Sequence, residues 1–247
     1  IGGTDGYTVA GRGELHLSIL LENMRREGYE VQVSRPEVIF KTVNGKEQEP
    51  MELMMCTVPE HYSGIIIEKL GKRKGVMQNL STLNGYTRLE YLIPTPGLIG
   101  LRSEFIIETH GEGVLDHCFS HYEDFKGDIA RRKNGVLISQ ELGETTAYAL
   151  WKIQERGILF CGPVTRVYEG MIIGENAKEG DLVVNCIKEK KLTNMRSSGA
   201  DDAITLTTPH IPTLEQALEF IEEDELVEIT PKSIRLRKKI LNETRRK

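Results

Sequence analysis

The sequence predicts a multi-domain α+β protein, and three observations support that fold class. Apolar residues recur at helical spacing in some segments and alternate in others. Residues 47–127 are predicted to contain a strand, a helix, a hairpin, a second helix and a last strand, in that order. After Lys126 the pattern changes to short strands and turns. A chain of 247 residues can form two to three small domains. We place the domains at residues 1–46, 47–127 and 128–247.

The first segment is predicted to contain one helix followed by an extended strand. Leu17, Leu20, Leu21 and Met24 share one face of a helix over residues 13–27, and Gly28 ends it. The alternation that follows is strand-like until Pro36 interrupts it. Residues 1–46 are therefore interpreted as the second half of a small α/β unit whose first half is missing.

The middle segment has the clearest local signals. A strand (ELMMCTVP) precedes a helix whose face includes Ile66 and Leu70. Asn84-Gly85 lies between two alternating runs, which predicts a two-residue hairpin because both residues tolerate positive φ. A helix over PTPGLIGLRSEFIIETHG and a strand over GVLDHCFSHYE complete the order β-α-β-β-α-β. This order predicts a ferredoxin-like unit.

Residues 128–247 are predicted to form a mostly β domain. Short strands are expected over GVLIS, TTAYAL, TRVYEGMIIGE and DLVVNCI, with a short helix around Trp151 to Arg156. Thr213 and Gln216 have the spacing of a capping box, which predicts a helix start. A closing hairpin is predicted over ELVEIT and SIRLRKK.

Composition limits the functional classes. The apolar content is 39%, and no apolar run approaches the roughly 20 residues of a membrane span. The four cysteines show no C-x-x-C pair, which favours buried thiols in the cytoplasm. The net charge of −5 argues against nucleic-acid binding over the whole surface but allows local basic patches. The chain begins at Ile1 in a loop-like run, and we interpret it as a fragment.

No catalytic, metal or cofactor site is predicted for this chain. The glycine spacing from Gly6 to Gly13 resembles a phosphate-binding loop, but it lacks the lysine and hydroxyl that contact phosphate and magnesium. His117, Cys118 and His121 have no partner cluster that would complete a zinc site, so structural or interface roles are favoured. Neither G-x-S-x-G nor H-E-x-x-H occurs.

Three basic clusters are the candidate RNA-binding sites, although each is also compatible with an ordinary solvated surface. The segment from Lys188 to Ala200 combines bases with small hydrogen-bonding residues, as expected for a loop that contacts phosphates and sugars. The predicted RNA-binding residues are Lys188, Lys190, Lys191, Asn194, Arg196 and Ser197, with Lys72, Arg73, Lys74, Arg131 and Arg132 from the other two clusters.

Long runs of the sequence resemble the TypA/BipA family of translational GTPases. The run AGRGELHLSILLENMRREGYE is similar to the end of domain III of factors related to elongation factor G, and residues 47–127 resemble their domain V. The runs RRKNGVLIS, VYEGMIIGE and DLVVNCIKEKKLTNMRSSGADDA are similar to the TypA/BipA family itself. This resemblance extends over nearly the whole chain.

The resemblance implies a cytoplasmic, monomeric ribosome-binding factor. It implies contacts with 50S and 70S particles, 23S rRNA and an A-site tRNA, and a role in large-subunit assembly and in cold or stress adaptation. GTP and Mg²⁺ would bind in an amino-terminal domain that this sequence does not include. An elongation-factor-4-like back-translocation factor and a ferredoxin-like metabolite-binding regulatory module are the alternatives.

Overall fold

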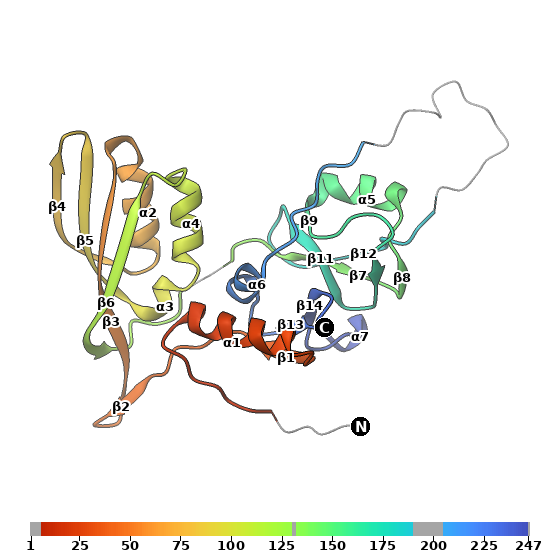
Figure 1. The fold of residues 1–247 in the computed structure, drawn as a ribbon, viewed down its shortest axis with the longest axis horizontal. Coiled ribbons are helices and arrows are strands. Elements are labelled where there is room, and N and C mark those ends of the chain that lie inside the picture. The colour runs from red at the N-terminus through yellow and green to blue at the C-terminus, as the bar shows by residue number, and fades with distance from the viewer. Residues whose placement is uncertain (1–5, 130–131, 190–204, 247) are drawn as a thin grey trace. The chain divides into compact units, whose positions relative to one another are not determined.

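The computed structural model describes residues 6–129, 132–189 and 205–246 and divides the chain into two compact units (Figure 1). One unit is residues 36–131, and the other combines residues 1–35 with residues 132–247. The predicted α+β, multi-domain class is confirmed. None of the described helices is both long and apolar enough to cross a membrane.

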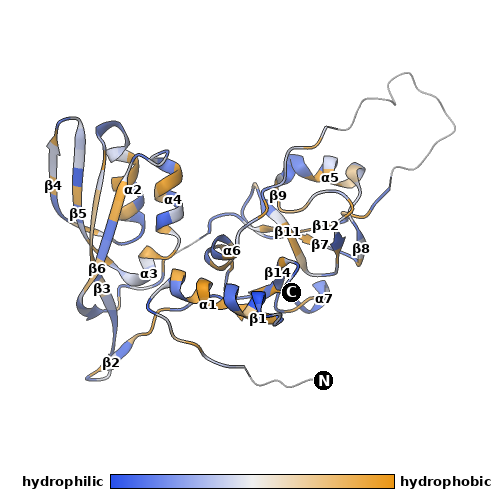
Figure 2. Cartoon of the chain, viewed as in Figure 1, coloured by the Kyte–Doolittle hydropathy of each residue, from blue (hydrophilic) through white to orange (hydrophobic). Residues whose placement is uncertain are grey.

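The unit of residues 36–131 is a sheet with helices on one face. Its elements are β2 (Lys41–Val43), β3 (Lys46–Pro59), η1 (Glu60–Tyr62), α2 (Ser63–Lys72), β4 (Val76–Leu83), β5 (Tyr86–Pro94), α3 (Thr95–Leu98), α4 (Leu101–Glu108) and β6 (Val114–Asp124). The main strands lie in the order β6-β3-β5-β4, all antiparallel, as in a ferredoxin-like fold. Alternate residues of β3 and β5 pack against α2 and α4, and Figure 2 shows hydrophobic residues on both helices.

Two turns shape this unit, and one of its helices is broken. Asn84 and Gly85 have φ of 52° and 80°, which confirms the predicted hairpin between β4 and β5. The same signal at Asn44-Gly45 forms the β2–β3 hairpin, which the sequence analysis missed. The single helix predicted over residues 94–111 is wrong. Gly100 takes a left-handed φ of 69° and separates α3 from α4.

The other unit has a central sheet covered on both faces. Its elements are α1 (Glu14–Arg26), β1 (Val31–Ser34), β7 (Val136–Ser139), β8 (Gly143–Glu144), α5 (Ala147–Ile153), η2 (Gln154–Arg156), β9 (Gly157–Leu159), β10 (Arg166–Val167), β11 (Met171–Asn176), β12 (Leu182–Val184), α6 (Leu214–Phe220), β13 (Glu225–Ile229), β14 (Ile234–Lys238) and α7 (Glu243–Arg246). The sheet order is β1-β13-β14-β11-β7-β12, with β9 pairing β11.

Alternation along the central strands creates two cores. Leu137 of β7 and Ile173 of β11 belong to the core that includes α5, whereas Ile138 and Ile172 belong to the core that includes α6. Both faces are therefore apolar, and β7 is buried along its whole length. Burying each of these side chains contributes about 1.5–3 kcal/mol.

Residues 31–34 extend this sheet. Val31 of β1 lies opposite Ile229 of β13 in an antiparallel register, and Leu21 of α1 packs on the α6 core. Arg25 also donates from Nε to the Thr230 carbonyl at 3.0 Å. The contacts thus group residues 1–35 with residues 132–247. The predicted domains, residues 1–46, 47–127 and 128–247, stay a prediction.

Local predictions for residues 132–246 had mixed outcomes. The capping box at Thr213 and Gln216 and the β13–β14 hairpin are confirmed. The strand predicted over TTAYAL is wrong, because the hydroxyl of Thr146 caps the helix α5. The helix expected from Trp151 to Arg156 therefore starts earlier, at Ala147. The cysteines are free thiols as predicted, but Cys118 is exposed rather than buried.

Candidate nucleic-acid interface

The predicted cluster at the end of α2 is used mostly for internal contacts. Lys72 is 72% exposed and pairs with Glu68, four residues earlier in α2. Arg73 is only 13% exposed and donates to the carbonyls of Gly97 and Ile99, at 2.7 and 2.8 Å. It also pairs with a carboxylate of α4. This geometry gives Arg73 a structural role in holding the α3–α4 corner.

Lys74 likewise contacts its own domain. Its Nζ donates to the carbonyl of Lys126 at 2.6 Å, and its backbone has a positive φ of 61°. Lys69, beside this cluster, pairs with Glu104 at 3.1 Å and Glu108 at 2.8 Å. Despite the opposing effect of burial, these two carboxylates raise the pKa of Lys69 above its ordinary value. RNA contact by Lys72, Arg73 and Lys74 stays a prediction.

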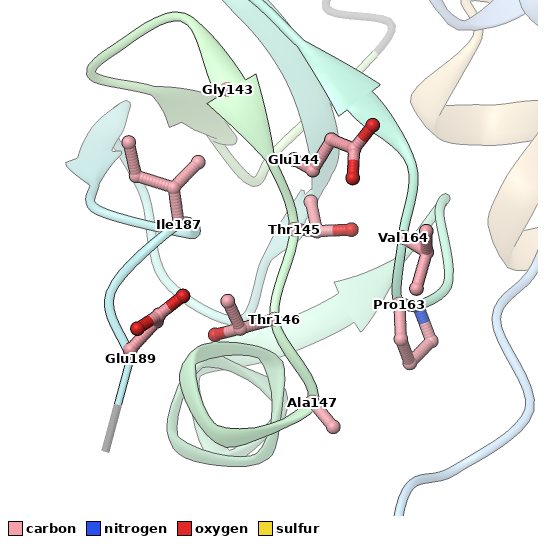
Figure 3. Close-up of a pocket in the computed structure, with 9 residues that line it drawn as sticks. All are labelled: Gly143, Glu144, Thr145, Thr146, Ala147, Pro163, Val164, Ile187 and Glu189. Carbon is pink, nitrogen blue, oxygen red and sulfur yellow. The ribbon is translucent and has the colours of Figure 1, made fainter. Parts of the chain in front are cut away.

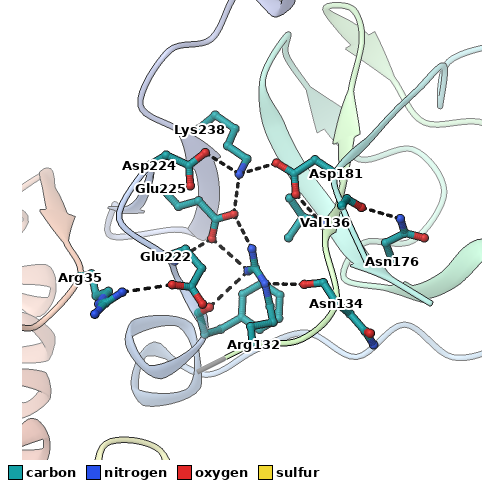
Figure 4. Close-up of polar contacts among 12 residues, drawn as sticks. Arg35, Arg132, Asn134, Val136, Asn176, Asp181, Glu222, Asp224, Glu225 and Lys238 are labelled. Carbon is teal, nitrogen blue, oxygen red and sulfur yellow. Dashed lines mark hydrogen bonds and ion pairs between the residues drawn. The ribbon is translucent and has the colours of Figure 1, made fainter. Parts of the chain in front are cut away.

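Arg132 lies in a buried charge network, and its neighbour Arg131 lies outside the described residues. The guanidinium of Arg132 is 11% exposed and binds both carboxylate oxygens of Glu225, at 2.8 and 3.0 Å (Figure 4). It also donates to the Asn134 carbonyl and lies 4.5 Å above the Phe220 ring. Burial opposes the charge, yet the contact with Glu225 raises the pKa of Arg132.

The same network neutralises part of the charge of β13 and β14. Lys238 is 3% exposed, and its Nζ lies 2.6 Å from Asp181 and 2.8 Å from each of Asp224 and Glu225 (Figure 4). Although burial opposes it, the coulombic attraction of Glu225 and the other carboxylates raises the pKa of Lys238. Arg237 and Lys238 of the basic tail are therefore paired with acids of the run that precedes it, and Arg132 has a structural role.

The third predicted cluster begins on a described residue but lies mostly beyond it. Lys188 is exposed on the segment that follows β12. The remaining predicted residues, namely Lys190, Lys191, Asn194, Arg196 and Ser197, lie outside the described residues. The structure does describe the chain on both sides of residues 190–204, and both sides contact the ends of α5.

The described residues on either side of residues 190–204, called the two arms of the basic segment, contact opposite ends of helix α5. Thr146, the residue that caps its start, donates from Oγ1 to the Lys188 carbonyl at 2.7 Å. Gln154, at its end, donates from Nε2 to the Thr205 carbonyl at 3.0 Å and accepts from the Thr207 amide at 3.0 Å. The predicted RNA-binding segment therefore leaves and re-enters the domain at α5.

One face of α5 borders a shallow groove that carries positive charge. The groove has a volume of about 260 Å³, and Lys152, Arg156 and Lys188 contribute its cations. Lys152 Nζ also lies 4.6 Å from the ring centre of Tyr148. The other lining residues are Ala149, Ile153, Val183, Val184 and Asn185. No carboxylate of the described residues lies within ion-pair distance of the three cations. A phosphate group could therefore approach them.

A second depression, at the start of α5, has the opposite charge. Figure 3 shows the side chains around it, with Thr146 at the first turn of the helix and Ile187 on the adjacent segment. It measures about 500 Å³ and includes Glu144 and Glu189, with no cation among its lining residues. Two carboxylates disfavour phosphate binding. The α5 groove is therefore the better candidate for nucleic acid.

Lys152 and Arg156 were not predicted as site residues, although a signal was present in the sequence. The two cations are four residues apart, and Tyr148 lies one turn before Lys152. Because residues 145–150 were predicted to form a strand, the helix face that these residues share was not recognised.

Among the described residues, no group of three or more His, Cys, Asp and Glu side chains is arranged to hold a metal ion.

The fold and the site define a class of protein: a ferredoxin-like unit joined to a mixed sheet whose helix α5 presents cations. Comparison with known families agrees with this class. Residues 46–133 match the elongation factor G C-terminus, and residues 134–243 match the TypA/BipA C-terminal domain. The chain belongs to the TypA/BipA family.

Curated relatives match along nearly the whole chain. A protein of Haemophilus influenzae named large ribosomal subunit assembly factor BipA is 56% identical over 98% of this chain. Proteins of the same name from Escherichia coli O6:H1 and Buchnera aphidicola are 53% and 55% identical over the same share. The chain spans 40% of the length of each of these relatives.

Proposed function

We propose that these domains dock a translational GTPase on ribosomal RNA during assembly of the large subunit. The single observation that carries the proposal is the anchoring of both arms of the basic segment at α5, next to a groove with three cations. Phosphate contacts from lysine and arginine position a protein on RNA. The names of the relatives supply the large subunit as the partner.

The same proposal includes the wider role of the family. The intact protein hydrolyses GTP with Mg²⁺ in a separate domain and acts as a cytoplasmic monomer that binds 50S and 70S particles. Its contacts are with 23S rRNA and the acceptor end of an A-site tRNA. We propose that this activity supports large-subunit assembly under cold and other stress.

Co-sedimentation with 50S and 70S particles over a salt series tests the proposal. The variant replaces Lys188, Lys190, Lys191 and Arg196 with alanine. Each phosphate contact contributes about 0.7–0.9 to the slope of log affinity against log salt. We therefore expect weaker binding and a flatter slope for this variant.

A matched control variant makes the same number of charge changes at lysines that belong neither to α5 nor to the basic segment. It replaces Lys41, Lys46, Lys232 and Lys239, all exposed, with alanine. We expect it to bind with the slope of the unmodified chain. Equal slopes for the two variants would contradict the assignment of the segment as the contact. If the unmodified chain fails to bind in low salt, repeating the series with the intact factor decides whether the RNA-docking proposal is kept.

A further inference from the structure

Helix α5 carries an exposed aromatic residue beside the cationic groove. Trp151 is the only tryptophan of the chain, and its side chain remains 40% exposed. It lies three residues after Tyr148, which places the two aromatic residues on neighbouring positions of the helix surface. The inward side of the same helix is formed by the buried residues Ala149, Leu150 and Ile153.

The charge around this face favours an anion. Lys152 and Arg156 are exposed and line the groove together with Lys188. The acidic side chains nearest in sequence are Glu155 and Glu189, and neither lines the groove. The Asn185 amide, a further lining group, donates to Glu141 at 3.2 Å. The cations therefore outnumber the carboxylates along this side of α5.

An aromatic ring next to a line of cations is the arrangement that binds unpaired nucleotides. Cations follow the phosphodiester backbone, while a base stacks on the exposed ring without a requirement for sequence. Paired bases are unavailable for such stacking because they already stack within the duplex. A groove of about 260 Å³ admits phosphate and sugar groups, whereas Trp151 is not among its lining residues and lies beside it on the helix.

We propose that the outer face of α5 binds a short stretch of unpaired RNA. Its phosphates contact Lys152, Arg156 and Lys188, and one base stacks on Trp151. This site rests on the proposed RNA-docking function but is distinct from residues 190–204, which it does not use. It assigns the partner as single-stranded rather than duplex RNA.

Fluorescence anisotropy with a labelled ten-nucleotide RNA of mixed sequence tests the proposal. The Lys152→Ala/Arg156→Ala variant loses two phosphate contacts, each worth about 0.7 in the salt slope for a single strand. We expect its slope to fall by about 1.4, which corresponds to roughly 25-fold weaker binding at 0.1 M salt if affinities converge at 1 M. Lys232→Ala/Lys239→Ala, with the same change in charge, should bind like the unmodified chain.

Intrinsic fluorescence reports the stacking, because Trp151 is the only indole. RNA should quench it and saturate at the concentration that saturates anisotropy. Trp151→Ala should weaken binding about 5- to 150-fold, the range for one stacked base, and Trp151→Phe should weaken it less. Circular dichroism checks that each variant is folded.

Three results would overturn the site: no quenching, equal affinities for the groove variant and its control, or equal affinity for duplex RNA. The ribosome sedimentation series separates this failure from failure of the proposed function. If unpaired RNA binds elsewhere on the chain and ribosome binding is retained, only the α5 site is contradicted. Loss of ribosome binding by the intact factor would remove the docking function.

Discussion

At the scale of single residues, the structure distinguishes cations that hold the fold from cations available to a ligand. Arg73 and Lys72 are neighbours in sequence, yet Arg73 is nearly buried and Lys72 extends into solvent. A sequence pattern records charge and spacing, and it does not record which carbonyls a guanidinium will meet after folding. For this reason the candidate cluster at the end of α2 could be found from sequence, but its internal contacts could not.

Replacing Arg73 with alanine should destabilise the ferredoxin-like unit. The change leaves the carbonyls of Gly97 and Ile99 without this donor and Glu104 without its guanidinium partner. Hydrogen bonds to charged groups contribute about 1.5–3 kcal/mol, so a loss of this size is expected in the free energy of unfolding. Denaturant titration measures it. Lys72→Ala is the control, expected to change stability by less than about 0.5 kcal/mol.

His117 and Glu52 should give the same unit a pH dependence. The hydrogen bond that His117 donates to the Glu52 carboxylate raises the pKa of His117 above 6.5, against the effect of burial. Burial also opposes the shift at Glu52, but its bonds to His117 and Thr95 lower its pKa below 4.5. The His117 contribution is complete below pH 6.5 and lost as pH rises through the folded pKa. The Glu52 contribution is lost as pH falls below 4.5.

NMR titration of the His117 ring measures this directly. Replacing Glu52 with glutamine should lower the pKa of His117 toward its ordinary value. His121, which contacts Glu123 instead, serves as the internal control. A His117 pKa at or below 6.5 in the unmodified chain would contradict the prediction.

At the scale of elements, turns and helix starts were predicted more accurately than the full extent of helices and strands. The Asn84-Gly85 hairpin and the Thr213 capping box depend on a few adjacent residues, and the structure confirms both. Helix α5 was partly missed because the run TTAYAL, which overlaps its start, begins with two strand-favouring threonines. Its cap at Thr146 involves a contact with Lys188 that is distant in sequence.

Removing the Thr146 hydroxyl should loosen both α5 and the adjacent arm. Thr146→Ala loses the bond from the Ala149 amide and the bond to the Lys188 carbonyl. We expect a loss of about 1–2 kcal/mol in stability, together with faster amide exchange in the first turn of α5. Thr146→Ser keeps the hydroxyl and is the matched control. Unchanged exchange in Thr146→Ala would contradict the predicted role.

The β13–β14 hairpin depends on a buried lysine. Lys238→Met should cost about 3–5 kcal/mol, because Glu225 is fully buried and loses one of its two cationic partners. The adjacent Lys239→Met is the control, since Lys239 is exposed. Denaturant titration of both variants compares them. Equal stabilities would mean that Lys238 and its carboxylates contribute no net stability to the hairpin.

At the scale of the whole molecule, the net charge does not reveal the cationic groove beside α5. The chain carries −5, but acids and bases of β13 and β14 pair with one another, leaving the cations of the α5 groove outside these pairs. The fold class and the resemblance were accessible from sequence because they depend on long patterns. The groove was not, because it brings β12, α5 and η2 together only after folding.

This charge distribution predicts that two surfaces contribute separately to RNA affinity. Contacts from the α5 groove and from residues 190–196 involve different phosphates, so their salt slopes should add in a combined variant. Ribosome sedimentation of Lys152→Ala/Arg156→Ala, of Lys190→Ala/Lys191→Ala/Arg196→Ala and of both together measures this. The combined loss of slope should equal the sum of the separate losses, about 1.4–1.8 plus about 2.1–2.7. Glu223→Gln, which changes an acid that is 81% exposed, should leave the slope unchanged. A combined loss no larger than that of one variant would show that the two surfaces contact the same phosphates.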